Sequence, residues 1–269
     1  MKTYLITGAT AGIGEACARR CLEQGDRVIV MCRSLAKAQA KFGPELESGR
    51  VVALEYDFSD NSQLFDFCRR ELKDYTIERM IHSAGFSLTQ KFTSTDHELM
   101  LKLYETHVFS LMELVRALLR LRKPEQELSI VTLSSVSASY AIPQVAAYSM
   151  TKASMEYYVS MINKVINVAP QKRLPLTAEQ MAQIDAIADP KEREHALFLA
   201  RAHAGLLLRI NAYGPSSVKT DIFDYDFIEE QGKMLPFVPI EVVVDGVLSL
   251  LENQYISGQS IVINNDIAS

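Results

Sequence analysis

The sequence of 269 residues lacks the patterns that identify several classes of protein. Its four cysteines show neither C-x-x-C spacing nor a paired framework, so we expect reduced thiols in a cytoplasmic protein. These cysteines are Cys17, Cys21, Cys32 and Cys68. The five histidines form no H-E-x-x-H or similar set, and we therefore expect no metal site.

Long apolar runs and an excess of positive charge are also missing. No run approaches the roughly 18 apolar residues that indicate a transmembrane helix. Met1 leads directly into a strand-like run instead of a charged and then apolar leader. The net charge of -5 gives no electrostatic reason to expect binding to nucleic acid or to an anionic membrane surface.

What the sequence does contain is a regular alternation of short apolar runs and longer helical patterns. The predicted strands are residues 2–6, 26–32, 50–56, 79–82, 128–133, 210–213 and 260–263. The predicted helices are residues 13–23, 35–42, 57–72, 98–121, 146–160 and 242–251. Such alternation predicts an α/β fold, a parallel, doubly wound sheet with helices on both faces. No repeat or linker interrupts the chain, so we expect residues 1–269 to form a single domain.

A glycine-rich turn follows the first predicted strand and opens the first predicted helix. The turn reads Thr7-Gly-Ala-Thr-Ala-Gly-Ile-Gly14. Gly8 would permit the tight turn, Gly12 the close approach of a pyrophosphate, and Gly14 close packing of helix on strand. The helix N-terminus adds free N–H donors and a partial positive charge. The pattern predicts a dinucleotide phosphate site, although a turn made only for packing would read the same way.

The end of the second predicted strand bears on which dinucleotide would bind. An NAD enzyme usually has an acidic residue here that binds the ribose 2′-hydroxyl. This sequence has neutral Cys32, followed by Arg33 and Ser34. An arginine can donate charge-assisted hydrogen bonds to a 2′-phosphate, so the sequence favours NADP(H) and leaves NAD(H) possible. Arg33 is alternatively an ordinary solvated charge at the end of a strand.

Tyr148 and Lys152 lie at positions i and i+4 of a predicted helix, on one face. A phenol with a pKa of about 10 is a poor proton donor at neutral pH, and a neighbouring ammonium lowers that pKa. Ser135 lies at the end of an apolar run and could hydrogen-bond an oxygen held against Tyr148. The three residues form a candidate set for general acid–base catalysis. A Y-x-x-x-K match alone also occurs by chance on surface helices.

Taken together, these motifs resemble the short-chain dehydrogenase/reductase family over nearly the whole chain. The spacing T-G-x-x-x-G-x-G is that of its compact oxidoreductase branch. Further matches, in the expected order, are Asp57, Ala84-Gly85, Ser134-Ser135, Tyr148 with Lys152, and Pro215 with Thr220. The resemblance implies a Rossmann-like fold, a small-molecule carbonyl or alcohol substrate, and a homodimer or homotetramer.

The resemblance also implies a role for each matching residue. Tyr148 would be the general acid/base, Lys152 would lower its pKa and contact the nicotinamide ribose, and Ser135 would orient the substrate oxygen. The implied cofactor-binding residues are Gly8, Gly12, Ile13, Gly14, Arg33, Ser34, Asp57, Ala84, Gly85, Tyr148, Lys152, Pro215 and Thr220. Among them, Asp57 would contact the adenine and Thr220 the carboxamide. We expect an NADP(H)-dependent oxidoreductase; the alternative is a non-catalytic dinucleotide sensor or scaffold on the same fold.

Three departures from the family pattern are visible. The usual N-N-A-G is His82-Ser-Ala-Gly85, and the usual P-G is Pro215-Ser216. By register, His107 takes the place of the asparagine that helps to hold a water in the family's proton relay. An imidazole can also bind a water, so two interpretations stay open: His107 acts in the relay, or it is a packed, hydrogen-bonded helix residue.

An insertion of roughly residues 163–205 separates the Tyr148 helix from the next predicted strand. A capping box at Thr177 and Gln180 predicts one helix, and Asp189-Pro190 predicts the start of another. The Tyr148 helix runs away from the carboxyl ends of the strands, where ligands bind. We therefore expect the insertion to serve as an oligomer or partner surface and not as a substrate lid, unless it reaches a neighbouring subunit as a long arm.

Residues 221–238 are the predicted cover of the substrate. Apolar and acidic side chains interleave there, which indicates a moderately hydrophobic substrate. Ordinary helix amphipathicity would give the same pattern.

Overall fold

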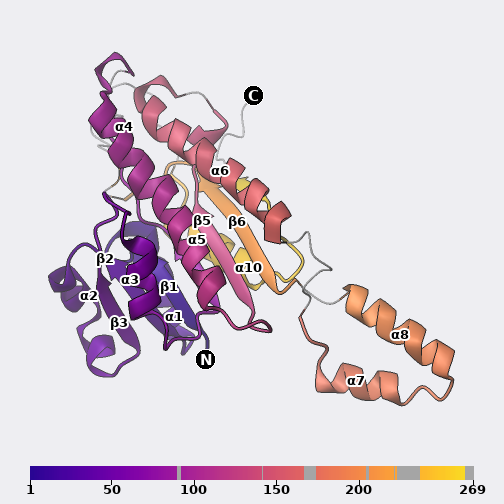
Figure 1. Cartoon of the computed structure of the whole chain (residues 1–269). Helices are drawn as coiled ribbons and strands as arrows, with labels where there is room; N and C mark the ends of the chain where they lie inside the picture. Colours follow the sequence, from indigo (N-terminus) through magenta and orange to yellow (C-terminus); the bar gives the residue numbers. More distant parts are fainter. Residues whose placement is uncertain are drawn as a thin grey trace.

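Seven parallel strands form one sheet in the order β3-β2-β1-β4-β5-β6-β7 (Figure 1). The computed structural model describes residues 1–89, 92–140, 142–166, 174–203, 206–220, 222 and 237–263. The strands are β1 (Thr3–Thr7), β2 (Arg27–Cys32), β3 (Val51–Glu55), β4 (Arg79–His82), β5 (Leu128–Leu133), β6 (Leu208–Pro215) and β7 (Ser260–Ile263). Strand order reverses between β1 and β4, so the carboxyl ends of these two strands border the crevice where such sheets bind ligands.

Two hydrophobic layers cover the two faces of this sheet. The helices that cover it are α1 (Gly12–Glu23), α2 (Leu35–Glu47), α3 (Leu64–Glu71), α5 (Ser110–Leu121), α6 (Ala146–Ile166) and α10 (Ile240–Glu252). One layer joins α1, α2 and α10, and the other joins α3, α5 and α6, which lie in front of the sheet in Figure 1. Along β2, Val28 and Val30 enter the first layer, whereas Ile29 and Met31 enter the second. The predicted doubly wound α/β fold is confirmed.

Residues 98–121, predicted as one helix, form three consecutive segments. These are α4 (His97–Tyr104), a π-helical turn η2 (Glu105–Phe109) and α5. Two side chains bond to the backbone of this region: the Ser110 hydroxyl donates to the Thr106 carbonyl (2.6 Å), and the His82 ring lies 3.2 Å from the His107 carbonyl. Side chains that bond to a helix backbone in this way disturb its regular ladder. The widened turn places His107 at its centre.

The helix predicted from residue 57 begins later, at Leu64. Asp57 accepts a hydrogen bond from the backbone N–H of Ser59 (3.0 Å), and Asp60 accepts one from Ser62 (2.9 Å). These two local turns satisfy backbone donors outside a helix, which is why short aspartate side chains delay helix formation here.

The insertion contains the two predicted helices, α7 (Ala178–Asp185) and α8 (Pro190–His203). Thr177 and Gln180 form the predicted capping box, and Asp189 accepts hydrogen bonds from the first backbone N–H groups of α8. The two helices pack against each other to the side of the amino-terminal ends of the strands (Figure 1). Residues 167–173 and 204–205 of the insertion lie outside the described residues. So does most of the predicted substrate cover, residues 221 and 223–236.

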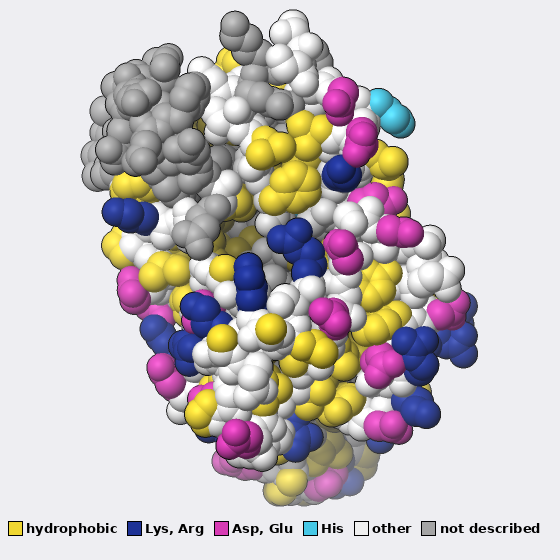
Figure 2. Space-filling model, turned by 90° about the vertical axis from the view of Figure 1, so that its left-hand side faces the viewer, with side chains coloured by type: hydrophobic (Ala, Val, Ile, Leu, Met, Phe, Trp, Pro, Cys, Tyr) yellow, Lys and Arg dark blue, Asp and Glu magenta, His cyan; other side chains and the backbone are white. Residues whose placement is uncertain are grey.

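The side of the molecule in Figure 2 carries interspersed acidic and basic side chains, with hydrophobic side chains between them. Charge on this face is therefore mixed and not separated by sign. Within the part of the chain that the structure describes, we find no helix with the length and hydropathy of a membrane span.

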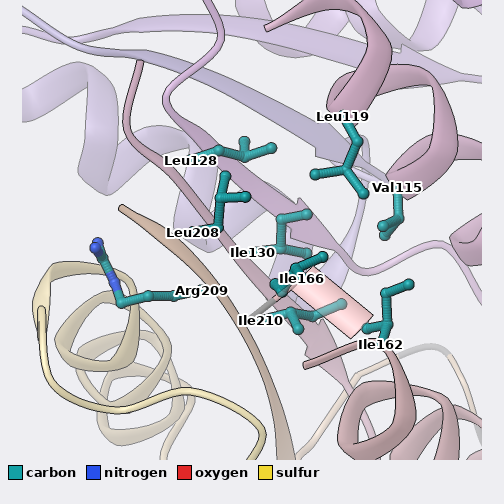
Figure 3. A pocket seen from close by; sticks show the side chains of 9 residues that line it. All are labelled: Val115, Leu119, Leu128, Ile130, Ile162, Ile166, Leu208, Arg209 and Ile210. Atoms are coloured by element: carbon teal, nitrogen blue, oxygen red, sulfur yellow. The ribbon is translucent and has the colours of Figure 1, made fainter. Parts of the chain in front are cut away.

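A small cavity of about 10 Å³ lies between β5, β6, α5 and α6. Its lining residues are Val115, Leu119, Leu128, Ile130, Ile162, Ile166, Leu208, Arg209 and Ile210 (Figure 3). A cavity that size holds one water at most, and an apolar lining offers that water few hydrogen-bond partners. It is a packing gap and not a ligand site.

Two buried arginines, Arg79 on β4 and Arg209 on β6, flank β5 at the amino-terminal end of the sheet. Both donate to Glu127, which immediately precedes β5, and Arg79 also pairs with Glu252 of α10 at 3.0 Å. The side chains of Arg79 and Arg209 are 2% and 0% exposed. Buried cations of this kind require a nearby anion, so Glu127 ties three neighbouring strands together.

We expect Glu127→Gln to lower the free energy of unfolding by about 3 kcal/mol, because it leaves buried arginine charge without its partner. The matched control is Glu113→Gln, which breaks the more exposed pair with Arg116 on α5 and should cost less than about 1 kcal/mol. Urea unfolding followed by circular dichroism measures both values. Equal values for the two variants would show that the network does not stabilise the sheet.

Candidate active site

The glycine-rich turn after β1 lies directly against the segment that follows β4. The Thr7 hydroxyl oxygen accepts hydrogen bonds from the backbone N–H groups of Ser83 (3.1 Å) and Ala84 (3.0 Å). Gly8 has a left-handed backbone, with φ of 66°, and a Cβ there would lie 2.9 Å from the Ala84 backbone. Only glycine satisfies both conditions, so the turn approaches Ala84 because residue 8 has no side chain.

Gly12 and Gly14 complete the turn. Gly12 also has a left-handed backbone (φ 54°), and a Cβ there would lie 3.3 Å from the methyl group of Thr220. At Gly14 a Cβ would lie 2.5 Å from the Gly8 carbonyl oxygen, so the predicted role in close helix–strand packing agrees with the geometry. Ala11, the N-cap of α1, makes no side-chain capping bond, which leaves the helix N-terminus suited to an anion.

The neighbouring strand ends carry the residues predicted for the adenosine half of a dinucleotide. Cys32 ends β2 in a buried position, and burial raises the pKa of its thiol, which donates to the Ser34 carbonyl (3.3 Å). Arg33 is exposed, and the Ser34 hydroxyl caps α2 by accepting from the N–H of Lys37. Asp57 follows β3, the partner of β2. Arg33 and Asp57 therefore lie at adjacent strand ends.

Tyr148 and Lys152 face the carboxyl end of β5 from α6. Each is 4% exposed, and the Lys152 Nζ donates to the Leu133 carbonyl oxygen (2.7 Å). The Nζ lies 5.2 Å from the centroid of the Tyr148 ring. Burial lowers the pKa of Lys152 to about 7, against the opposing effect of Glu156. The ammonium is thus close to the phenol and gives up its proton far more readily than an exposed lysine does.

Ser135 begins a 3₁₀ turn, η3 (Val136–Ala138), directly after β5. Its hydroxyl oxygen accepts from the N–H (3.2 Å) and the hydroxyl (3.1 Å) of Ser137. Among the described residues its own proton has no acceptor, so it is available to a substrate oxygen. Gly214 in β6 supports this position, because a Cβ there would lie 3.1 Å from the Ser135 backbone. Pro215 ends the same strand.

A buried histidine pair connects the glycine-rich turn to α6. Thr7 accepts two backbone N–H groups, so its hydroxyl proton goes to His82 Nδ1 (3.0 Å). The other ring nitrogen, Nε2–H, donates to the His107 carbonyl. His107 Nε2 accepts from the N–H of Phe86 (3.1 Å), so its Nδ1–H donates to Thr151 Oγ1 (2.7 Å). The Thr7 hydroxyl thus fixes the tautomer of His82, and the Phe86 N–H fixes that of His107.

Both histidines are fully buried and neutral. Burial is the main cause of their lowered pKa values, to about 3 for His82 and well below the usual value for His107, and the charge of Lys152 adds to it. Because both ring nitrogens of His107 bond to protein groups, the structure favours a packed residue over a water-binding relay group. Thr151 links His107 to the backbone of Tyr148, since its hydroxyl donates to the Tyr148 carbonyl (2.7 Å).

The structure thus brings together most of the predicted residues. The glycine-rich turn contains Gly8, Gly12 and Gly14, and it lies against Ala84 and Thr220. Gly85 joins this group to α6, because a Cβ there would lie 2.9 Å from His107 and 3.9 Å from the Lys152 Nζ. Thr7, Thr151 and Glu156 were not among the predicted residues. Only Thr7 had a local signal, its position directly before Gly8, whereas the other two acquire their contacts from distant strands and turns.

Comparison with known proteins identifies the family. A family model described as short chain dehydrogenase matches residues 2–167. A "Dehydrogenase/reductase SDR family protein 7-like" from Drosophila melanogaster is 30% identical over 180 residues, 62% of this chain and 55% of that protein. A human "Inactive hydroxysteroid dehydrogenase-like protein 1" is 26% identical over 161 residues, 57% and 48% of the two chains. The chain thus spans about half the length of the curated relatives it matches.

Solved structures show the same fold. A short-chain dehydrogenase from Burkholderia cenocepacia J2315 in complex with NADP has a TM-score of 0.74 at 17% identity and covers 98% of this chain and 96% of its own. A 4-hydroxyisoleucine dehydrogenase complexed with NADH has a TM-score of 0.72 at 18% identity and covers 98% of each chain.

The neutral histidine pair predicts a loss of stability in mild acid. The unfolded chain takes up protons on histidine as the pH falls through about 6.5, whereas folded His82 stays neutral down to about pH 3. The free energy of unfolding should therefore fall by up to about 1.4 kcal/mol per pH unit for each histidine below pH 6.5. Denaturant unfolding between pH 7 and pH 5 measures this slope.

The double variant His82→Asn/His107→Asn should remove most of that slope, and His195→Asn, on the exposed surface of α8, should leave it unchanged. Glu252, whose pKa is lowered to about 2 by Arg79 and Lys2 against the effect of burial, contributes only below about pH 4.5. A full slope in the double variant would contradict the assignment.

Proposed function

The chain belongs to the short-chain dehydrogenase family, and on that premise we propose that it is an NADP(H)-dependent oxidoreductase that interconverts a ketone or aldehyde and an alcohol. One observation carries the proposal. Tyr148 and Lys152 are buried side by side on α6 against the strand end that presents Ser135. That strand end lies at the same edge of the sheet as the glycine-rich turn.

The residues at this edge fit a dinucleotide. Gly8 and Gly12 hold left-handed positions in a turn that leads into the N-terminus of α1, which the Ala11 side chain does not cap. Backbone N–H groups and the helix dipole at such a terminus favour a pyrophosphate. Gly8, Gly12, Ile13 and Gly14 would hold the pyrophosphate and the nearby ribose, Asp57 the adenine, Ala84 and Gly85 the adenosine ribose, and Pro215 and Thr220 the nicotinamide end.

The reaction divides between the dinucleotide and the protein. The dinucleotide, when bound, supplies or accepts the hydride. In the reducing direction the Tyr148 hydroxyl holds the proton that the substrate oxygen takes up, and Ser135 donates a hydrogen bond that orients that oxygen. Lys152 lies close enough to stabilise the phenolate that remains. Because Tyr148 and Lys152 are buried, bulk water has little access to these two side chains.

NADP(H) is the proposed preference because of Arg33. It follows β2 where an acidic residue would repel a 2′-phosphate. Its exposed guanidinium has no partner among the described residues and can make charge-assisted hydrogen bonds. The fold itself does not decide this preference, since one structural neighbour was solved with NADP and another with NADH.

A non-catalytic dinucleotide sensor or scaffold is the second candidate. It is favoured by relatives that are named inactive, such as the human hydroxysteroid dehydrogenase-like protein. Against it, the present chain keeps Ser135, Tyr148 and Lys152 together. Turnover of any carbonyl with NADPH separates the two functions.

We also propose a homo-oligomer, as the family resemblance implies. Exposed apolar side chains on the outer face of α6, including Tyr157, Met161 and Val165, support a subunit contact there. Phe198 of α8 adds a second exposed apolar position on the insertion.

Tyr148→Phe should reduce turnover at least about a thousandfold and leave the affinity for NADPH nearly unchanged, because it removes only the proton donor. Fluorescence titration gives the affinity, and oxidation of NADPH with a panel of ketones and aldehydes gives the turnover. Tyr255→Phe is the matched control, since Tyr255 lies between α10 and β7, outside the proposed subunit contact, with 68% of its surface exposed. Near-normal turnover of Tyr148→Phe would refute the mechanism.

Arg33→Asp should raise the Kd for NADPH about a hundredfold, because it replaces charge-assisted bonds to the 2′-phosphate with repulsion. The Kd for NADH should stay the same or fall, since an aspartate can accept from the 2′-hydroxyl. Arg69→Asp, a change of the same charge on the exposed side of α3, serves as the control. An unchanged ratio of the two Kd values in Arg33→Asp would overturn the assignment.

A further inference from the structure

Three side chains form one stripe on α6 that faces the end of β5. Tyr148, Lys152 and Glu156 are spaced four residues apart, so they lie above one another on the helix. Lys152 donates to the Leu133 carbonyl (2.7 Å), and the Ser134 hydroxyl donates to Glu156 Oε1 (2.6 Å). Two bonds from one helix face thus hold the two residues that precede Ser135.

The bond to Glu156 fixes Ser134 from a second side. The Ser134 N–H already donates to the Tyr213 carbonyl of β6 (2.8 Å), and its side chain is buried. A hydroxyl that donates to a carboxylate at 2.6 Å makes a strong, charge-assisted bond. Because Ser135 directly follows Ser134, the backbone next to Ser135 is held by β6 on one side and by α6 on the other.

Glu156 also supplies the negative charge that the buried ammonium of Lys152 requires. The other titratable groups that face Lys152 are Tyr148 on the same helix, His107 from η2 and His82 from β4. Both histidines are neutral. Among the described residues, Glu156 is the acidic group whose charge acts on Lys152, and it favours the ammonium that burial disfavours.

We propose that Glu156 is a positioning residue of the Ser135, Tyr148 and Lys152 set, which anchors the end of β5 through Ser134 and places a negative charge one helical turn from Lys152. The inference rests on the proposed function for its consequence in catalysis. Its two physical parts, the bond and the charge, belong to the protein itself and are separable by mutation.

Two variants separate the parts. Glu156→Gln keeps an acceptor for Ser134 and removes the charge, whereas Ser134→Ala removes the bond and keeps the charge. Glu98→Gln, an identical change at an exposed position of α4, is the matched control. Glu156→Asp keeps the charge on a shorter side chain and serves as the conservative variant. Glu156→Ala, which removes the charge and the acceptor together, replaces Glu156→Gln if that variant does not fold.

The first readout needs no turnover. NMR of ¹³Cε-labelled lysine, with Lys152 assigned by Lys152→Arg, follows the titration of the full-length protein. We expect Glu156→Gln to lower the midpoint of Lys152 by about one pH unit, and Ser134→Ala, Glu98→Gln and Glu156→Asp to leave it in place. An unmoved midpoint in Glu156→Gln overturns the charge role, whatever the enzyme does.

The second readout is catalytic. Ser134→Ala should lower kcat about tenfold without moving the pH profile or the affinity for NADPH, because the Ser135 hydroxyl is less well held. Glu156→Gln should move the alkaline limb of the profile toward acid by the same shift as its Lys152 midpoint. Full kcat in Ser134→Ala overturns the anchoring role. If the wild type turns over no carbonyl, the proposed function fails, and the lysine titration still decides on Glu156.

Discussion

The candidate site depends on one buried cation. Lys152 is nearly removed from water, and its ammonium is held by the Leu133 carbonyl beside the Tyr148 ring. Burial makes the cation costly, which is the reason that its proton is labile near neutral pH and that its charge acts strongly on a neighbouring phenol. Two neighbouring histidines are kept neutral by their own burial and, to a smaller extent, by the charge of Lys152, and the acidic Glu156 lies one helical turn away. The site therefore works as one electrostatic unit.

Hydrogen bonds extend that unit to the edge of the sheet. Thr7, His82, His107 and Thr151 form a continuous path from the glycine-rich turn to the Tyr148 helix. The His82 ring accepts from Thr7 and donates to the His107 carbonyl, whereas the His107 ring accepts from the Phe86 N–H and donates to Thr151. Each ring therefore uses one nitrogen as an acceptor, so both rings must be neutral. The π-helical turn at His107 belongs to this path, because its carbonyl bonds to His82 instead of serving only its own helix. The glycine-rich turn and the Tyr148 helix are held in one arrangement by groups that themselves stay uncharged.

The two ends of the sheet handle charge differently. At the carboxyl ends, the buried ammonium of Lys152 has only the carboxylate of Glu156, one helical turn away, as an acidic neighbour among the described residues. At the amino-terminal end, Arg79 and Arg209 are buried with Glu127 and Glu252, and each of these two arginines has an anion within bonding distance. The paired charges of the arginines and glutamates hold neighbouring strands together. A buried charge that is only partly compensated, as that of Lys152 is, has a shifted pKa of the kind found at functional sites. This contrast separates the stabilising end of the molecule from the reactive end.

Local pattern alone determined most of the architecture. Seven apolar runs predicted the strands and their sheet, and the glycines predicted the turn after β1. The i, i+4 spacing of Tyr148 and Lys152 predicted that they share a helix face. These features are local, because the period of a strand, a positive φ angle and the period of a helix depend on residues that are close together in the sequence. The capping groups Thr177 and Asp189 located the insertion helices for the same reason. Tertiary structure decided the rest. The start of α3 and the π-helical turn depend on side chains that bond to backbone, and the contacts of Glu156, Thr151 and His107 join residues far apart in the chain. Burial, which gives Lys152 its lowered pKa, exists only once α6 packs against β6 and the turn that follows β5.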